Sequence, residues 1–155
     1  MNRFILIVIA SFILSGCNGQ SDETIMKNTS SKVLESIKSK NTKKFKGLIG
    51  VELDVIGKDD EFLQTDLDEL GLYYERYTKN TTPPITLTDE YDQLGHRRVI
   101  IVFYKGTDTA NNISEVNLEL FFGPPNFVPL TKISDYKIVV KNLKEKPITA
   151  PPNIN

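Results

Sequence analysis

The residue types that most often carry chemistry are scarce in this chain. Its 155 residues include one cysteine, Cys17, and one histidine, His96. A structural zinc site usually takes four Cys or His ligands, so the chain cannot supply one of the common zinc sites. We therefore predict no metal site and no cofactor, and we assign no catalytic residue.

Cys17 follows an N-terminal segment with the pattern of an export signal. Arg3 forms a basic start, an apolar run covers residues 4–14, and two small residues precede the cysteine. Eleven helical residues rise only about 16 Å, whereas the hydrocarbon layer of a membrane is roughly 30 Å thick. The pattern predicts a signal peptide over residues 1–16, cleaved between Gly16 and Cys17.

The tetrapeptide Leu14-Ser15-Gly16-Cys17 resembles the bacterial lipobox. The resemblance implies a thioether between the Cys17 sulfur and diacylglycerol, and two or more acyl chains give a durable membrane anchor. The domain would then lie outside the cytoplasm, at the cell membrane or the outer membrane. Because the lipid would use the one thiol, a Cys/His nucleophile pair is also excluded. The alternatives are a plain signal peptide with a chance cysteine and a short buried core helix.

Composition bounds the mature protein. Removal of 16 of the 155 residues leaves 139, which suits one domain with a real core. The chain carries 19 basic and 20 acidic residues, and loss of Arg3 leaves a net charge of about −2. This balance gives no excess of positive charge that would attract nucleic acid. We predict a lipid-anchored tether at 17–23, one domain at 24–146 and a disordered tail at 147–155, which is rich in Pro and Asn.

Hydrophobic periodicity separates the chain into a helical half and a strand half. Apolar residues recur at helical spacing before Pro83-Pro84, and alternating or β-branched residues follow it. The predicted helices cover about residues 22–39, 43–50 and 59–77. The predicted strands lie around residues 85–91, 99–104, 116–122 and 136–140. Short Gly- and Asn-containing connections predict an antiparallel meander.

Helices followed by strands predict an α+β fold, with the N-terminal helices packed on a curved antiparallel sheet of about four strands. This order and the stretch VLESIKSKNTKKFKGLI at residues 33–49 resemble the cystatin-like, nuclear-transport-factor-like superfamily. The resemblance spans roughly residues 22–143 and includes no diagnostic catalytic motif. It implies a cone with a pocket between sheet and helices, but a fold alone does not determine a function.

Tyrosines and one aspartate are the candidates for such a pocket. The resemblance implies a ligand pocket lined by Tyr74, Tyr77, Tyr104 and Asp135, since enzymes of this superfamily use Asp or Tyr there. The alternative is that a tyrosine stripe at helical spacing packs in the core or at its rim, with its hydroxyls reaching water.

Three other polar groups have simpler interpretations. Asp92 and His96 flank a predicted hairpin turn, where polar residues serve the backbone. The acidic run at 54–69 lacks the loop pattern of a calcium site, so we interpret it as a solvated helix face. The lysines between residues 38 and 46 are either solvated surface or a contact with anionic headgroups near the anchor.

Three phenylalanines surround one predicted loop. Phe121, Phe122 and Phe127 lie on either side of Gly123 and the Pro-Pro-Asn segment. If the rings are exposed, they mark a partner surface. If they fold back, they close the open end of the sheet.

The preferred hypothesis is a non-enzymatic cell-envelope lipoprotein that binds another envelope protein or a small ligand. One alternative is a low-turnover enzyme of the cone type that acts on an apolar substrate. The other is an immunity or inhibitor lipoprotein that blocks a secreted toxin through the aromatic loop. Convergence of Asp135 or of two tyrosine hydroxyls inside a closed pocket would favour the enzyme.

Overall fold

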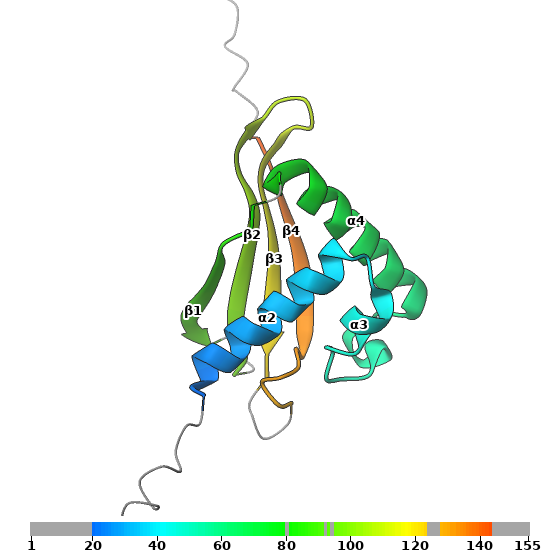
Figure 1. Cartoon of the computed structure of the whole chain (residues 1–155), viewed down its shortest axis with the longest axis vertical. Helices are drawn as coiled ribbons and strands as arrows, with labels where there is room; N and C mark the ends of the chain where they lie inside the picture. Colours follow the sequence, from blue (N-terminus) through cyan, green and yellow to red (C-terminus); the bar gives the residue numbers. More distant parts are fainter. Residues whose placement is uncertain (1–19, 80, 92, 94, 124–127, 144–155) are drawn as a thin grey trace, which may run out of the picture.

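The fold is α+β, as predicted, with all helices before all strands (Figure 1). The computed structural model describes residues 20–79, 81–91, 93, 95–123 and 128–143. The helices are α2 (Asp22–Lys38), α3 (Thr42–Lys46), the 3-10 helix η1 (Leu53–Ile56) and α4 (Asp60–Thr78). The strands are β1 (Ile85–Tyr91), β2 (Arg97–Asp108), β3 (Ile113–Phe122) and β4 (Asp135–Asn142).

Several predicted features lie outside the described residues. These are the signal peptide, its cleavage site, Phe127 and the tail at 147–155. Within the described part of the chain, no helix is both long and apolar enough to cross a membrane.

Helix α2 begins where a capping residue allows it. The Ser21 hydroxyl accepts a hydrogen bond from the Thr24 amide at 3.3 Å, and Asp22 and Glu23 carry negative charge in the first turn. Both features stabilise a helix N-terminus. The helix therefore starts at Asp22, as its periodicity predicted, and its first two residues overlap the end of the predicted tether at 17–23.

The four strands form one open antiparallel sheet in the order β1-β2-β3-β4. Alternate residues of the central strands are fully buried, among them Val99 and Ile101 in β2 and Leu118 and Leu120 in β3. Because successive side chains of a strand point to opposite faces, this alternation defines one apolar face. Figure 1 shows α2 crossing the strands, and its contacts with β1 and β2, like those of α4 with β2, cover this face.

The register of β2 against β3 shifts at two places, and the first shift lies at Phe103. Phe103 is an extra residue of β2 relative to β3, and such a bulge redirects side chains. Phe103 and Tyr104 consequently both reach α4, although they are consecutive. The Phe103 ring lies edge-on to Tyr74, with centroids 6.5 Å apart, and the Tyr104 ring stacks on Tyr77 at 4.4 Å.

A second connection joins the helical layer to the sheet. Ile49 and Ile133 form an isolated parallel bridge, and the Gly50 amide donates to the Ile133 carbonyl at 2.8 Å. A Cβ on Gly50 would lie 2.5 Å from Cγ1 of Val128, so only glycine fits this crossing. The bridge holds the segment before β4 against the loop after α3.

Apolar side chains with no solvent exposure fill the space between the helices and the sheet. The largest of them come from every layer of the fold: Met26, Ile37, Phe45, Leu63, Leu67, Leu70, Ile101, Leu118 and Leu120. Helix α4 also contains Gly71, where a Cβ would approach Cε of Lys40 to 3.0 Å. Gly71 thus makes room for the aliphatic part of the Lys40 side chain.

Helix α4 offers a matched test of this core. Leu67 has no exposure, whereas Leu72 of the same helix is 56% exposed. We expect Leu67→Ala to lower the free energy of unfolding by about 2 to 5 kcal/mol, because it leaves a cavity. Leu72→Ala should change it by no more than about 0.5 kcal/mol. Urea unfolding followed by circular dichroism measures both, and equal effects would contradict the packing described.

Candidate functional site

The structure brings together two of the four residues predicted to line a pocket. Tyr77 of α4 stacks on Tyr104 of β2, and Tyr74 lies one helical turn earlier against Phe103. Asp135 begins β4, and the last residue of that strand pairs with Ile113 at the β2–β3 hairpin. At about 3.3 Å per residue, Asp135 lies about 23 Å along the sheet from that hairpin. The predicted four-residue pocket is therefore not formed.

Tyr77 and Tyr104 instead line an open groove, which we call the distal groove. It has a volume of about 530 Å³ and lies between the end of α4 and the β2–β3 hairpin. Its lining residues are Arg76, Tyr77, Lys79, Tyr104, Thr107, Asp108, Thr109 and Ala110. The groove thus combines two half-buried aromatic rings with two cations and one carboxylate.

Asp108 organises the hairpin side of the groove. Its Oδ2 accepts hydrogen bonds from the Tyr77 hydroxyl at 2.8 Å and from the Asn111 side-chain amide at 2.8 Å. Its Oδ1 accepts from the Asn111 backbone amide at 3.1 Å, which closes the turn in which Asn112 adopts a positive φ of 55°. The hydrogen bond from Tyr77, followed by that from Asn111, lowers the pKa of Asp108.

The protonation states in the distal groove follow from the same contacts. Burial raises the pKa of Tyr77, and its hydrogen bond to Asp108 raises it further. Near neutral pH the tyrosine therefore stays protonated and the aspartate stays ionised. The Tyr77 hydroxyl proton is therefore directed at the ionised Asp108 carboxylate, and the hydrogen bond joins the end of α4 to the β2–β3 hairpin.

The aromatic surface continues along α4 beyond the groove. Tyr73 stacks against Tyr77 with centroids 6.3 Å apart, and its hydroxyl donates to Oε1 of Glu69 at 2.7 Å. Burial and this hydrogen bond raise the pKa of Tyr73 to about 12. Arg76 lies over the Tyr77 ring at 5.9 Å and donates to Asn111 at 3.1 Å.

A separate polar cluster lies under α4 near β4. The Tyr136 hydroxyl donates to Oδ2 of Asp66 at 2.6 Å, and Nζ of Lys58 donates to the same oxygen at 3.1 Å. The Lys58 ammonium also lies 4.3 Å from the centroid of the Tyr136 ring. Burial, and then the hydrogen bond to Asp66, raise the pKa of Tyr136 well above its usual range. The cluster ties α4 to β4 with a tyrosine that remains neutral.

This cluster corrects one sequence interpretation. Asp66 belongs to the acidic run at 54–69, which we predicted to be a solvated face. It is only 9% exposed, and a lysine and a tyrosine pair with it. The other acidic residues of α4 are exposed or only half-buried, so Asp66 is the buried member of the run.

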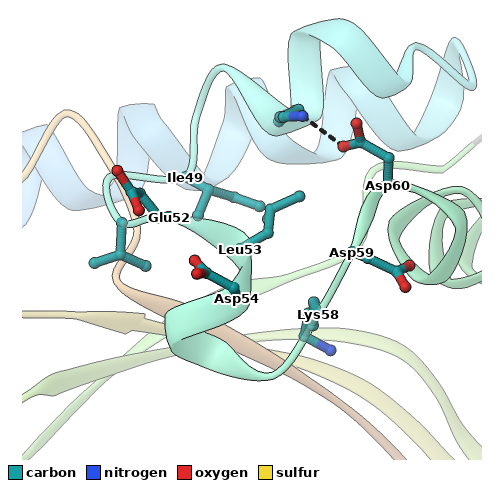
Figure 2. A pocket seen from close by; sticks show the side chains of 9 residues that line it. Ile49, Glu52, Leu53, Asp54, Lys58, Asp59 and Asp60 are labelled. Carbon is teal, nitrogen blue, oxygen red and sulfur yellow. Dashed lines mark hydrogen bonds and ion pairs between the residues drawn. The ribbon is translucent and has the colours of Figure 1, made fainter.

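Three other acids of the run, Asp54, Asp59 and Asp60, line a pocket of about 550 Å³ (Figure 2). Asp59 caps α4, with its Oδ1 accepting from the Phe62 amide at 2.7 Å. Asp60 forms an ion pair with Lys46 at 2.5 Å, drawn as a dashed line in Figure 2. Among the described residues, no group of three His, Cys, Asp or Glu side chains is placed to hold a metal ion.

Phe121 and Phe122, two residues of the predicted partner surface, lie on opposite faces of β3. Phe122 is 1% exposed and belongs to the core, so it cannot form an exposed surface. Phe121 is half-buried on the opposite face of β3. Burial of Phe122 agrees with the alternative in which the ring folds back. Of the predicted turn pair, His96 is half-buried, and Asp92 lies outside the described residues.

Sequence reasoning missed the roles of Arg76 and Asp108 in the distal groove. Arg76 is next to Tyr77 in the chain, but nothing in the sequence shows that it reaches Asn111. Asp108 ends a strand beside Asn111 and Asn112, a composition typical of a turn. Its partner Tyr77 is 31 residues away.

Comparison with known proteins adds no relative. No family model matches the chain, and no curated protein and no solved structure is significantly similar to it. The lipoprotein identity and the resemblance to the cystatin-like, nuclear-transport-factor-like superfamily therefore remain predictions.

The hydrogen bond between Tyr77 and Asp108 can be tested directly. Tyr77→Phe keeps the stacked ring but removes the hydroxyl that is the largest cause of the low pKa of Asp108. We expect the pKa of Asp108 to rise toward its ordinary value, measured by titrating side-chain carboxyl carbons with NMR. Tyr74→Phe, one turn earlier on α4, is the control. An unchanged pKa in Tyr77→Phe would show that the contact does not exist in solution.

Proposed function

We propose that this chain is a lipoprotein of the bacterial cell envelope, anchored by diacylglycerol on Cys17, whose domain is a non-enzymatic binding module. The distal groove is its proposed contact with a protein partner. The anchor places the domain outside the cytoplasm, on the cell membrane or the outer membrane. No cofactor or nucleic acid takes part in this proposal.

One observation carries the proposal: the start of the domain and the distal groove lie at opposite ends of the sheet. Helix α2 starts at Asp22, five residues after Cys17, beside the residue at which β2 begins, Arg97. Strand β2 runs for 12 residues to Asp108, a span of about 36 Å. Figure 1 shows the start of α2 near one end of the strands and the β2–β3 hairpin at the other.

The short connection between Cys17 and α2 determines which end of the sheet would lie near the membrane. Five extended residues reach at most about 18 Å, so a lipid on Cys17 would keep the start of α2 close to the bilayer. The distal groove would then face away from the membrane. A surface in that position is accessible to proteins of the envelope.

The composition of the distal groove favours a protein partner. Tyrosine and arginine are enriched where protein interfaces gain most of their binding energy. Tyr77, Tyr104 and Arg76 are held in place by stacking and by hydrogen bonds to the hairpin, so little conformational entropy is lost on binding. Arg76 and Lys79 suit a partner surface with acidic groups.

The geometry supports binding over the enzyme alternative. The condition set for an enzyme was convergence of Asp135, or of two tyrosine hydroxyls, in a closed pocket. Asp135 lies toward the other end of β4, and the Tyr77 hydroxyl is bonded to Asp108 in an open groove. Burial of Phe122 likewise leaves less aromatic surface for the immunity or inhibitor alternative.

The anchor is tested in the native bacterium. We expect the natural chain to fractionate with membranes and to carry the mass of diacylglycerol on a peptide that begins at Cys17. Cys17→Ser should abolish both the mass increase and the membrane association. Ser11→Ala, within the apolar run, should preserve them. An unmodified, full-length natural chain in the cytosolic fraction would refute the proposal.

The partner is tested by crosslinking in intact envelopes, followed by mass spectrometry of the captured complex. Arg76→Glu reverses a charge in the distal groove and should abolish the crosslinked species. Lys43→Glu makes the same charge change at an exposed position of α3 and should retain it. Loss of the species in both variants, or in neither, would exclude the distal groove as the contact.

A further inference from the structure

Strand β4 is an outer strand of the sheet (Figure 1). Within the described residues it pairs with β3 alone, in an uninterrupted register from Asp135 to Lys141. An outer strand turns the N–H and C=O groups of every second residue away from the sheet, where another strand can bond to them. Before β4 this position is taken by the bridge between Ile133 and Ile49, and the Tyr136 amide is bonded to the Asp135 carboxylate at 2.7 Å. The free edge therefore covers residues 137–141.

A groove of about 480 Å³ follows this edge on the helical side of the sheet. Three of its lining residues are apolar and keep solvent-exposed surface: Phe62 is 51% exposed, Val140 is 38% exposed and Ile138 is half-buried. A chain that lies along the free edge would contact these exposed side chains.

The course of α4 explains why Val140 is exposed on the face that otherwise forms the core. Its pairing partner in β3, Val116, has no exposure. Helix α4 contacts the start of β4 at Tyr136, whereas its last turns contact β2, where Tyr77 stacks on Tyr104. The helix thus crosses the sheet from β4 to β2 and leaves the end of β4 uncovered.

The other face of the same edge carries positive charge. Lys137 and Lys141 are exposed on the face of β4 that points away from the helices. Among the described residues, Lys137 makes no ion pair. Nζ of Lys141 pairs with Glu115 at 2.9 Å, but its side chain remains 58% exposed. A strand added at this edge would therefore lie beside two lysines.

We propose that β4 accepts an extended acidic segment of another protein as a fifth strand of the sheet. Side chains of that segment that point toward the helices are apolar and fill the groove between Phe62 and Val140. The alternate side chains are acidic and lie opposite Lys137 and Lys141. Main-chain hydrogen bonds supply affinity in such additions, and side chains supply specificity, because opposite charges on paired positions stabilise a sheet and like charges destabilise it. This contact is separate from the distal groove and does not depend on the lipid on Cys17.

Binding of designed peptides to the purified full chain in a non-ionic detergent tests this class of partner. A short fluorescent peptide that alternates glutamate and valine is compared by anisotropy with one that alternates lysine and valine. We expect the acidic peptide to bind at least about tenfold more tightly, because two charge pairs change sign. Equal affinity of the two peptides, or no binding of the acidic peptide at millimolar concentration, would overturn the proposal.

N-Methylation separates strand addition from binding in the groove alone. Alternate residues of an added strand turn their N–H groups toward β4, so the acidic peptide is methylated either on its valine nitrogens or on its glutamate nitrogens. One of these two peptides should lose binding and the other should retain it. If the two bind equally, the segment does not add as a strand and the proposal fails.

Two pairs of variants test the location. Lys137→Glu should weaken binding of the acidic peptide at least about threefold, whereas Lys43→Glu, the same change at an exposed position of α3, should not. Phe62→Ala should also weaken it at least about threefold. Leu72→Ala is its control, because Leu72 is 56% exposed on α4 but does not line the groove. Equal affinities of each variant and its control, in chains shown by circular dichroism to be folded, would place the peptide elsewhere.

Light scattering of the natural chain over a range of concentrations tests whether a second copy takes this position. We expect a single copy of the chain at each concentration. A dimer that Phe62→Ala dissociates, and Leu72→Ala does not, would show that a second copy occupies the edge and would overturn the proposal.

Discussion

The structure depends on the burial of one face of the antiparallel sheet. Every second residue is apolar and buried from Val99 to Phe103 of β2 and from Val116 to Phe122 of β3. Burying such a face against the apolar stripes of α2 and α4 is the main favourable contribution to folding. Because α2 and α4 both cover this face, the surface features of the domain lie at the two ends of the sheet, along its β4 edge and on its other face. On that other face Arg98 pairs with Glu119.

Two local departures from this pattern shape the helix–sheet interface. The bulge at Phe103 lets two consecutive aromatic residues contact α4, and so places Tyr104 against Tyr77. Near the opposite end of α4, Asp66 points inward and accepts hydrogen bonds from Lys58 and Tyr136. A buried carboxylate is costly without partners, so this part of α4 is held in one position relative to β4.

Most of the fold was predictable because its signals are local. The predicted helices and strands were confirmed, with ends within a few residues of those observed, since periodicity reports which side of an element is buried. The site was predicted only in part. Tyr77 and Tyr104 do meet, but Asp135 lies elsewhere on the sheet, Phe122 is in the core, and Asp66 is not solvated. Spacing alone cannot show which of several acidic residues turns inward, nor where along a strand a helix crosses it.

The sequence by itself determined the order of the elements, the scarcity of Cys and His chemistry, and the Leu14-Ser15-Gly16-Cys17 pattern on which the proposed anchor rests. Each of these depends on residue types at fixed separations along the chain. Only the tertiary structure decided that Tyr77 bonds to Asp108 and that Phe62 and Val140 line one groove. Those pairs are far apart in sequence, and the strand register and the course of α4 bring them together.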